Sequence, residues 1–331
     1  MPTENQSPRV SRRPTSMRTS RRAGGESLPV KSDGPLWWRF GGVVRSLRPH
    51  QWVKNVFVLA PVVFAKEVFA PPLLIRAGTA FVAFCFLASA VYTINDIADV
   101  EADRVHRLKR HRPIASGRVS IGFAKVMAAV LIVGSLTGAA FLSTGFFVTA
   151  AAYLLLNLAY SFKLKHVAYL DVGCIAAGFV LRVVAGGFAT AIEVSWYLLL
   201  CTALLALFLG FGKRRHELSA AAAKGARQRA ALESYTAAGL ERALGVTAVA
   251  TAVTYLVYTL DPHTRAFFRS DYLWATTIFV AAGILRFLQI VRHRPRAESP
   301  TQEMLRDGPF VAIVLLWLGL VLFVVYRLRP G

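Results

Sequence analysis

Apolar runs long enough to cross a lipid bilayer recur along most of this 331-residue chain. A helix needs about 20 residues to cross the hydrocarbon core, and lipid offers no partners for exposed backbone groups. Segments of this length and spacing therefore have to be helical. The predicted spans are residues 51–69, 77–97, 121–142, 145–161, 168–190, 195–212, 242–260, 271–291 and 309–326. The sequence thus predicts an all-α, polytopic integral membrane protein with nine transmembrane helices.

The charged residues set the expected orientation of these spans. Only 17% of the residues are charged, which is less than a water-soluble globule carries, but 39 Lys and Arg stand against 18 Asp and Glu. Thirty of the 39 fall on one side of the predicted spans, six on the other, and three within spans. The positive-inside rule then predicts a cytoplasmic N-terminus. Because topology explains most of the basic charge, we expect no nucleic-acid partner.

The first 42 residues differ in composition from the rest of the chain. They are rich in Ser, Pro, Arg and Gly and lack apolar periodicity, so they cannot bury enough surface to offset the entropy of ordering. We predict a disordered basic cytoplasmic tail over residues 1–42 and a transmembrane domain over residues 43–331. An organelle transit peptide is a less favoured interpretation of the tail. The three cysteines lack the spacing of a zinc site or a disulfide framework.

The second predicted span ends in an acidic cluster made of Asn95, Asp96, Asp99 and Asp103. At about 100° per residue these side chains share one helix face. Like charges at this spacing repel, and ionised groups at membrane depth are costly, so the cluster needs a compensating cation. Carboxylate oxygens favour Mg²⁺. We therefore predict Asp96, Asp99 and Asp103 as magnesium ligands, and the alternative is that they pair with the following Arg and Lys residues.

Basic residues follow the acidic cluster directly, among them Lys109 and Arg112. Arg offers bidentate donors to phosphate and Lys a compact charge. Acids that hold a metal next to bases that hold phosphate suggest a substrate carrying diphosphate. A positive-inside loop accounts for some of these bases but not for their adjacency to the acids.

Further polar residues fall at the same predicted membrane level or within spans. Tyr160, Ser161, Lys165 and Asp171 surround the loop after the fourth span, with ordinary loop residues as the alternative interpretation. Arg182 lies three helical turns beyond Asp171, inside a span, where an ionised residue is a functional candidate by default. The candidates at the first and sixth spans are Lys54, Asn55, Lys213 and Arg214.

Two motifs resemble those of the UbiA superfamily of intramembrane prenyltransferases. They are Asn95-Asp96-x-x-Asp99-x-x-x-Asp103 and Tyr160-Ser161-x-x-Leu164-Lys165. The resemblance covers residues 46–327 and implies a UbiA-like helical bundle, a Mg²⁺-dependent transferase and a site facing the cytoplasm. The catalytic candidates are then Asp96, Asp99, Asp103, Tyr160, Lys165 and Asp171. The substrate-binding candidates are Lys54, Asn55, Asn95, Lys109, Arg112, Ser161, Arg182, Lys213 and Arg214.

Within that superfamily, residues 48–55, 109–117 and 212–214 are similar to the decaprenyl-phosphate phosphoribosyltransferase branch. That resemblance implies transfer of phosphoribosyl from phosphoribosyl pyrophosphate to a polyprenyl phosphate in the bacterial inner membrane, with release of diphosphate, for the lipid-linked arabinose of cell-wall polysaccharide. Two departures are Ile175, where a second acid is expected, and Arg107, where Pro is expected. Assembly into a homo-oligomer stays open.

Two other functions compete with phosphoribosyl transfer. Prenyl transfer from a prenyl diphosphate to an aromatic acceptor would use the same acidic cluster, but the basic caps of the first and sixth spans suit a donor with more phosphate. A transporter would place its acids near the bilayer midplane on broken helices and show internal repeats. The acids here lie at span ends, and we detect no repeat, so the transporter is disfavoured.

Overall fold

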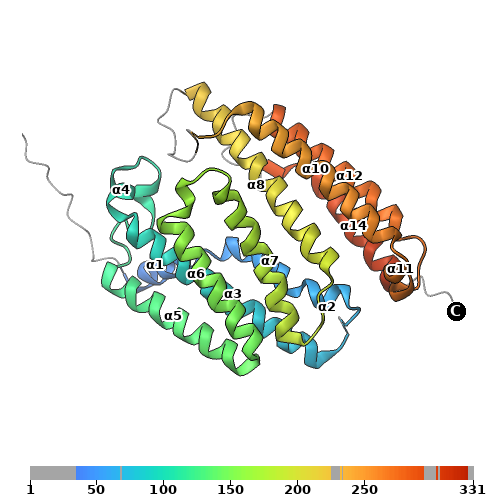
Figure 1. Ribbon diagram of the computed structural model, residues 1–331. Coiled ribbons are helices and arrows are strands. Elements are labelled where there is room, and N and C mark those ends of the chain that lie inside the picture. Colours follow the sequence, from blue (N-terminus) through green and yellow to red (C-terminus); the bar gives the residue numbers. More distant parts are fainter. Residues whose placement is uncertain are drawn as a thin grey trace, which may run out of the picture.

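The computed structural model describes residues 35–67, 69–224, 232, 234–293, 303, 304 and 306–326. All regular structure in this part of the chain is helical, which confirms the predicted fold class. Eight of its helices are long and apolar enough to cross a membrane, and they lie side by side in one bundle (Figure 1). They are α3 (Pro71–Ala98), α5 (Ile121–Leu142), α6 (Thr144–Phe162), α7 (Leu170–Thr190), α8 (Trp196–Lys224), α10 (Ala237–Leu260), α12 (Thr276–His293) and α14 (Gly308–Tyr326).

The first predicted span, residues 51–69, is not one continuous α-helix. It consists of the 3₁₀ helix η1 (Pro49–Leu59) and the short helix α2 (Ala60–Phe64). Apolar composition does not distinguish the tighter 3₁₀ winding from an α-helix, and a long 3₁₀ stretch is uncommon. The count of nine spans is therefore not confirmed. Gly186 lets η1 approach α7 closely, because a Cβ there would collide with the carbonyl oxygen of Val58.

Helix α1 (Leu36–Leu47) begins inside the segment predicted to be disordered. The predicted boundary at residue 42 is thus wrong for residues 36–42, where Trp37 and Phe40 give an apolar face at the edge of a tail that is otherwise mostly polar in composition. Val43 packs beside Ile114 and Val119 in a small core cluster. Residues 1–34 of the predicted tail lie outside the described residues.

Local signals in the sequence set the ends of the helices. Ser120 caps α5 by accepting a hydrogen bond from the Phe123 N–H, and Ser143 caps α6 by accepting one from the Phe146 N–H. These caps make the predicted bounds of α5 agree with those observed. Helix α8 runs a further 12 residues beyond its predicted end at residue 212, so Lys213 and Arg214 lie on the helix.

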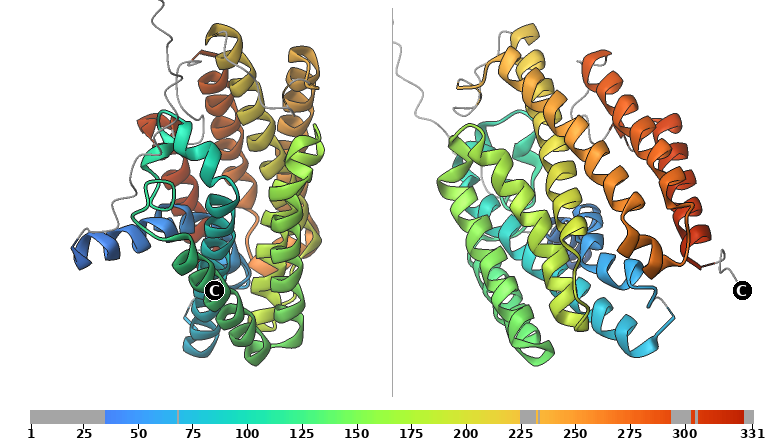
Figure 2. Two further views of the ribbon diagram at one scale, coloured as in Figure 1. Left: turned by 90° about the vertical axis from the view of Figure 1, so that its left-hand side faces the viewer. Right: turned by 45° about the vertical axis from the view of Figure 1, so that its right-hand side comes forward.

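Two packed clusters form the interior of the bundle. One contains Phe84 of α3, Phe146 and Tyr153 of α6, and Ala185 of α7. The other joins α7 and α8 to α10 and α12 and includes Phe208, Leu244 and Phe287. Figure 2 shows the axes of these long helices lying roughly parallel, with successive helices alternating in chain direction.

The chain order brings several helix ends to one end of the bundle. Helices α3, α6 and α8 finish there, and α5, α7 and α10 begin there. The short elements α4 (Val100–Val105), η2 (Lys109–His111) and η3 (Leu164–His166) lie in its connections. We call this the basic end, because the helices that flank the predicted Lys- and Arg-rich loops end or begin there. It lies at the upper left of Figure 1.

Candidate active site

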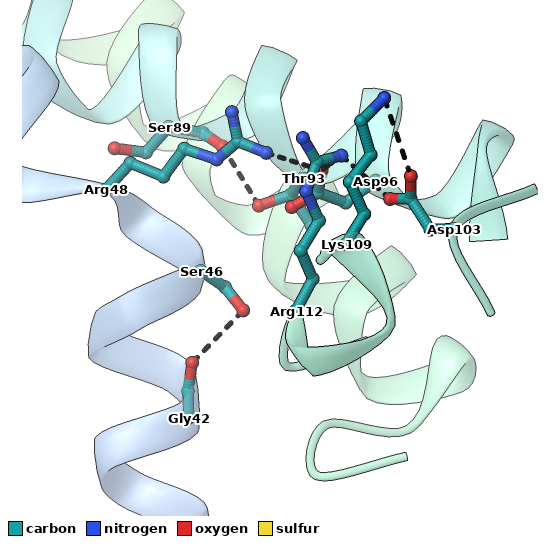
Figure 3. Close-up of polar contacts among 9 residues, drawn as sticks. All are labelled: Gly42, Ser46, Arg48, Ser89, Thr93, Asp96, Asp103, Lys109 and Arg112. Carbon is teal, nitrogen blue, oxygen red and sulfur yellow. Dashed lines mark hydrogen bonds and ion pairs between the residues drawn. The ribbon is translucent and has the colours of Figure 1, made fainter. Parts of the chain in front are cut away.

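The acidic cluster at the basic end is paired with basic side chains (Figure 3). The side chain of Asp96 is buried, and its Oδ1 lies 2.5 Å from Arg48 Nη2 and 3.0 Å from Arg112 Nη1. Asp103 is also buried, with its Oδ2 2.7 Å from Arg112 Nη1 and its Oδ1 4.0 Å from Lys109 Nζ. Three cations thus face the two buried carboxylates, so these five side chains together carry a net positive charge, which suits an anionic ligand.

The predicted three-carboxylate ligand set is assembled only in part. Helix α3 ends at Ala98 and α4 begins at Val100, so Asp99 forms the junction between them. Its carboxylate makes no ion pair with any of the residues that the structure describes. Across those residues, no group of three or more His, Cys, Asp or Glu side chains is arranged to hold a metal. In this structure Asp96 and Asp103 pair with nearby Arg and Lys residues, which is the alternative that the sequence left open.

The donor chemistry still fits Mg²⁺. Oxygens of Asp96 and Asp103 approach one and the same atom, Arg112 Nη1, from 3.0 and 2.7 Å. Two buried carboxylates therefore converge on a position that already holds positive charge. Mg²⁺ in phosphate-handling sites is commonly bound through one or two carboxylates plus substrate phosphates. Two carboxylates from the protein are enough for such a site.

Arg182, predicted as a substrate contact, is buried and fully partnered inside the bundle. Its Nε donates to Asn55 Oδ1, its Nη1 to the Gly178 carbonyl and its Nη2 to Tyr153 Oη, each at 2.8 Å. The guanidinium also lies 4.7 Å from the centre of the Tyr153 ring. Asn55 is equally buried and donates to Cys85 Sγ. Through these contacts, Arg182 and Asn55 join η1 to α6 and α7.

Lys54 precedes Asn55 on η1, and its side chain is exposed. The charges that act on its ammonium come from Lys213, Arg182 and Arg48, which are all positive. These residues come from η1, α7, α8 and the residue before η1, so the fold concentrates basic groups from distant parts of the sequence. Such a concentration favours binding of phosphate.

Asp171, predicted to be catalytic, is completely buried in a separate ion-pair network. Its Oδ2 lies 2.5 Å from Arg214 Nε, and its Oδ1 accepts a hydrogen bond of 2.6 Å from Tyr235 Oη. Arg214 also contacts Glu217 at 2.5 Å. Burial, together with the Asp171 carboxylate, raises the pKa of the Tyr235 phenol. The network joins the start of α7 to α8 and to the connection before α10.

The remaining candidates come from α3, α6 and η3. Tyr160 of α6 acts electrostatically on Arg214, so the two predicted residues are neighbours. Ser161 is buried and donates back to the Asn157 carbonyl at 2.6 Å within its own helix. Lys165, in η3, is partly exposed at the basic end. Asn95, one turn before Asp99, is partly exposed on α3.

Sequence reasoning missed two residues of these networks. Arg48 was noted only as part of a motif, although it directly precedes Pro49 and η1, where a basic residue at a helix start is a signal for an anion site. Tyr235 lies in a polar connection that shows no pattern, and its link to Asp171 spans 64 positions. No local signal in the sequence predicts that contact.

An apolar cavity of about 360 Å³ borders η1 and α2. It is bounded by α2, α8, α10, α12 and α14, and its lining includes Phe57, Ala60, Leu205, Tyr255, Phe287 and Trp317. Phe57 is three residues beyond Lys54 on η1, so the cavity begins one 3₁₀ turn from the basic groups. A basic surface followed by an apolar cavity suits an amphiphile with a phosphate head and a hydrocarbon tail.

Comparison with known proteins identifies the family. A sequence profile of the UbiA prenyltransferase family matches residues 56–305. The chain belongs to the UbiA prenyltransferase family. It is accordingly a membrane transferase, as the two motifs of the sequence predicted.

Relatives of known name cover most of the chain. A decaprenyl-phosphate phosphoribosyltransferase of Corynebacterium glutamicum is 37% identical over 290 residues, which are 86% of this chain and 87% of the relative. A protein of the same name from Mycobacterium tuberculosis is 38% identical over 85% of this chain and 93% of its own length. The resemblance to this branch of the family is thus confirmed.

Solved UbiA structures share the fold. A UbiA homologue of Archaeoglobus fulgidus bound to DMAPP and Mg²⁺ superposes with a TM-score of 0.63 at 22% identity, over 86% of this chain and 99% of that one. A UbiA homologue of Aeropyrum pernix gives 0.61 at 18% identity, over 83% and 97%. The predicted UbiA-like bundle is confirmed at the level of the fold.

Proposed function

We propose that this protein transfers 5-phosphoribosyl from phosphoribosyl pyrophosphate to a polyprenyl phosphate, with release of diphosphate. Relatives that are 37 and 38% identical over most of their length carry the name decaprenyl-phosphate phosphoribosyltransferase. The product is a lipid-linked pentose phosphate of the kind used to build cell-wall arabinose. The reaction belongs to the cytoplasmic face of a bacterial cell membrane.

The observation that carries this proposal is the order of surfaces along η1. Basic groups gather around Lys54. One of them, Arg48, also pairs with Asp96 of the acidic cluster. The apolar cavity begins at Phe57. Both substrates carry phosphate, and one also carries a long hydrocarbon chain. Each CH₂ group that leaves water contributes about 0.8 kcal/mol, so a polyprenyl tail in the cavity supplies much of the acceptor affinity.

The chemistry requires stabilisation of a leaving group more than activation of a nucleophile. An oxygen of the polyprenyl phosphate forms a bond to the anomeric carbon, and the bond from that carbon to the diphosphate oxygen breaks. Diphosphate departs with the bonding electron pair. Because the attacking phosphate is already ionised, no general base is required. Lys109 and Arg112 neutralise the charge that develops on the leaving diphosphate.

Asp96 and Asp103 would hold Mg²⁺, with Asp99 at the junction between α3 and α4 as the third ligand. When bound there, Mg²⁺ supplies charge neutralisation on the diphosphate. Arg48 and Arg112 now share the two buried carboxylates, and their guanidinium groups become donors to phosphate once those carboxylates have another cation. Lys54 and Lys213 bind the second phosphate group.

Asp171 and Arg214 act in this proposal through position, and not through contact with substrate. Their network leaves Asp171 no exposed surface, so it does not supply a second metal site. Many enzymes that use prenyl diphosphates carry a fuller second acidic motif. A single acidic cluster therefore favours the phosphoribosyl donor. Tyr160, a neighbour of Arg214, and Lys165, at the basic end, orient the donor.

The test is a transfer assay with purified protein in detergent. Radiolabelled phosphoribosyl pyrophosphate, polyprenyl phosphate and Mg²⁺ are incubated with the wild type, with Asp96→Asn, and with Glu101→Gln as a matched control. Glu101 is an exposed acid on α4 that pairs only with the neighbouring Arg104 among the described residues. We expect label in the lipid phase for the wild type and Glu101→Gln, and a loss for Asp96→Asn. Absence of lipid label with the wild type contradicts the proposal.

A further inference from the structure

Helix α1 leaves an apolar face uncovered. Trp37 and Phe40 are 74% and 70% exposed, and Val44 is also exposed. At about 100° per residue these three side chains fall within an arc of about 60°. An exposed face of this kind, made of two large aromatic residues and a β-branched one, marks a contact with a membrane or another protein.

The opposite face of α1 is fixed to the bundle. Arg118, just before α5, donates from Nε to the Trp38 carbonyl at 2.5 Å and stacks its guanidinium 4.9 Å from the Trp38 ring centre. Ser89 of α3 donates to the Leu47 carbonyl at 2.8 Å. These contacts place α1 beside the start of α5 and beside α3 nine residues before that helix ends, which is near the basic end.

The direction of α1 also sets it apart from the spans. It projects sideways from the bundle and crosses the direction of the long helices (Figure 2, left, blue). The turn occurs at Arg48, whose left-handed backbone, with φ 51° and ψ 58°, ends α1 and starts η1. A helix that lies across the spans at the level of their ends runs in the plane of the membrane surface.

Charge around this face indicates which surface it contacts. Arg45 is exposed at the edge of the apolar face, about 80° from Trp37. The 35 residues that precede α1 in the sequence add seven Lys or Arg against three Asp or Glu. Positive charge beside exposed aromatic residues is the pattern that binds anionic lipid headgroups.

We propose that α1 is an in-plane membrane helix that inserts its Trp37, Phe40 and Val44 face into the leaflet at the basic end and binds anionic lipid through Arg45. The inference does not depend on the reaction that the protein catalyses. Arg48 directly follows α1 and pairs with Asp96. The helix that contacts the lipid surface therefore also positions one cation beside the acidic cluster.

The test measures where the face of α1 lies. A nitroxide label is attached to full-length Phe40→Cys, and to Glu101→Cys as an aqueous reference, after reconstitution in vesicles of phosphatidylcholine alone or with 30 mol% phosphatidylglycerol. Labelling of the unsubstituted chain corrects for Cys85, Cys174 and Cys201. Power saturation then compares collisions with oxygen, which partitions into lipid, and with a water-soluble nickel chelate.

We expect the ratio of oxygen to nickel accessibility at position 40 to exceed that at position 101 several-fold, and to rise with phosphatidylglycerol. Arg45→Gln is expected to reduce that rise. Equal ratios at positions 40 and 101 would place the face in water and overturn the proposal. Exclusion of both reagents would show that another protein surface, such as a second copy of the chain, covers the face, and it would also overturn the proposal. A ratio at position 40 that is indifferent to phosphatidylglycerol would overturn the assignment of anionic lipid.

Discussion

The guanidinium of Arg214 lies 2.5 Å from the carboxylate of Asp171, and both side chains are almost completely buried. Two charged groups from α8 and α7 thus satisfy each other at a place that sequence reasoning assigned to catalysis. A buried pair of this kind tolerates removal of neither partner, because the remaining charge keeps its cost of desolvation.

We predict that Asp171→Asn lowers the free energy of unfolding by about 3–5 kcal/mol, because it leaves Arg214 buried with only Glu217 as an acidic partner. Thermal unfolding in detergent, followed by size-exclusion chromatography, measures the change. Ser161→Ala is the control, since Ser161 only bonds back within its helix. Equal midpoints for the two variants would exclude a structural role for the pair.

Tyr235→Phe removes one hydrogen bond to Asp171 while the Arg214 contact remains. We expect a smaller loss than in Asp171→Asn, about 1–3 kcal/mol, since Asp171 Oδ1 keeps its hydrogen bond from the Val172 N–H and only the Tyr169 N–H is left without its acceptor. The same unfolding assay ranks the two variants. A loss in Tyr235→Phe as large as that in Asp171→Asn would mean that the phenol, and not the guanidinium, dominates the network.

Removal of Arg112 tests the link between the acids and Mg²⁺ without an activity measurement. In Arg112→Gln the carboxylates of Asp96 and Asp103 lose the cation that they share, so their mutual repulsion lowers the unfolding temperature in the presence of a chelator. Added Mg²⁺ is expected to restore more of that temperature in the variant than it adds to the wild type. The control is Arg110→Gln, an exposed residue of η2. A variant that responds to Mg²⁺ no more than the wild type would refute the metal assignment.

Lys54 provides a test of the second phosphate position. Lys54→Gln removes one charged donor to phosphate, worth about 1.5–3 kcal/mol, and is expected to raise the KM for a phosphorylated substrate about tenfold or more. Lys125→Gln is the matched control, because Lys125 is an exposed residue in the second turn of α5. Steady-state kinetics with each substrate varied in turn show which one is affected. Identical KM values in the two variants would remove Lys54 from the site.

Much of the fold follows from apolar length and capping residues. The bounds of α5 and α14 agree with prediction to within one residue, because Ser120 and Asp307 accept capping hydrogen bonds at the starts of long apolar runs. The first span was wrong in detail, since hydropathy does not report helix type. Helix α1 was missed because its apolar face is short and lies at the edge of a polar segment.

The candidate site was predictable where its residues lie close together in the sequence. The acids Asp96 and Asp103 stand on one face at helical spacing, and the structure brings them together around Arg112. The contacts of Asp171 and Arg182 were not predictable, because their partners Tyr235 and Tyr153 are 64 and 29 positions away. An ionised residue inside a span signals importance, but not whether it contacts a ligand or another helix.

The most direct test of the central claim offers both chemistries to the protein at once. Wild-type protein in Mg²⁺-containing detergent receives phosphoribosyl pyrophosphate with a polyprenyl phosphate, and a prenyl diphosphate with an aromatic acceptor, in one reaction, and mass spectrometry identifies the lipid products. The account predicts a polyprenyl phosphate heavier by one phosphoribosyl group, absent with Asp96→Asn. A prenylated aromatic product, with the polyprenyl phosphate unchanged, would contradict it.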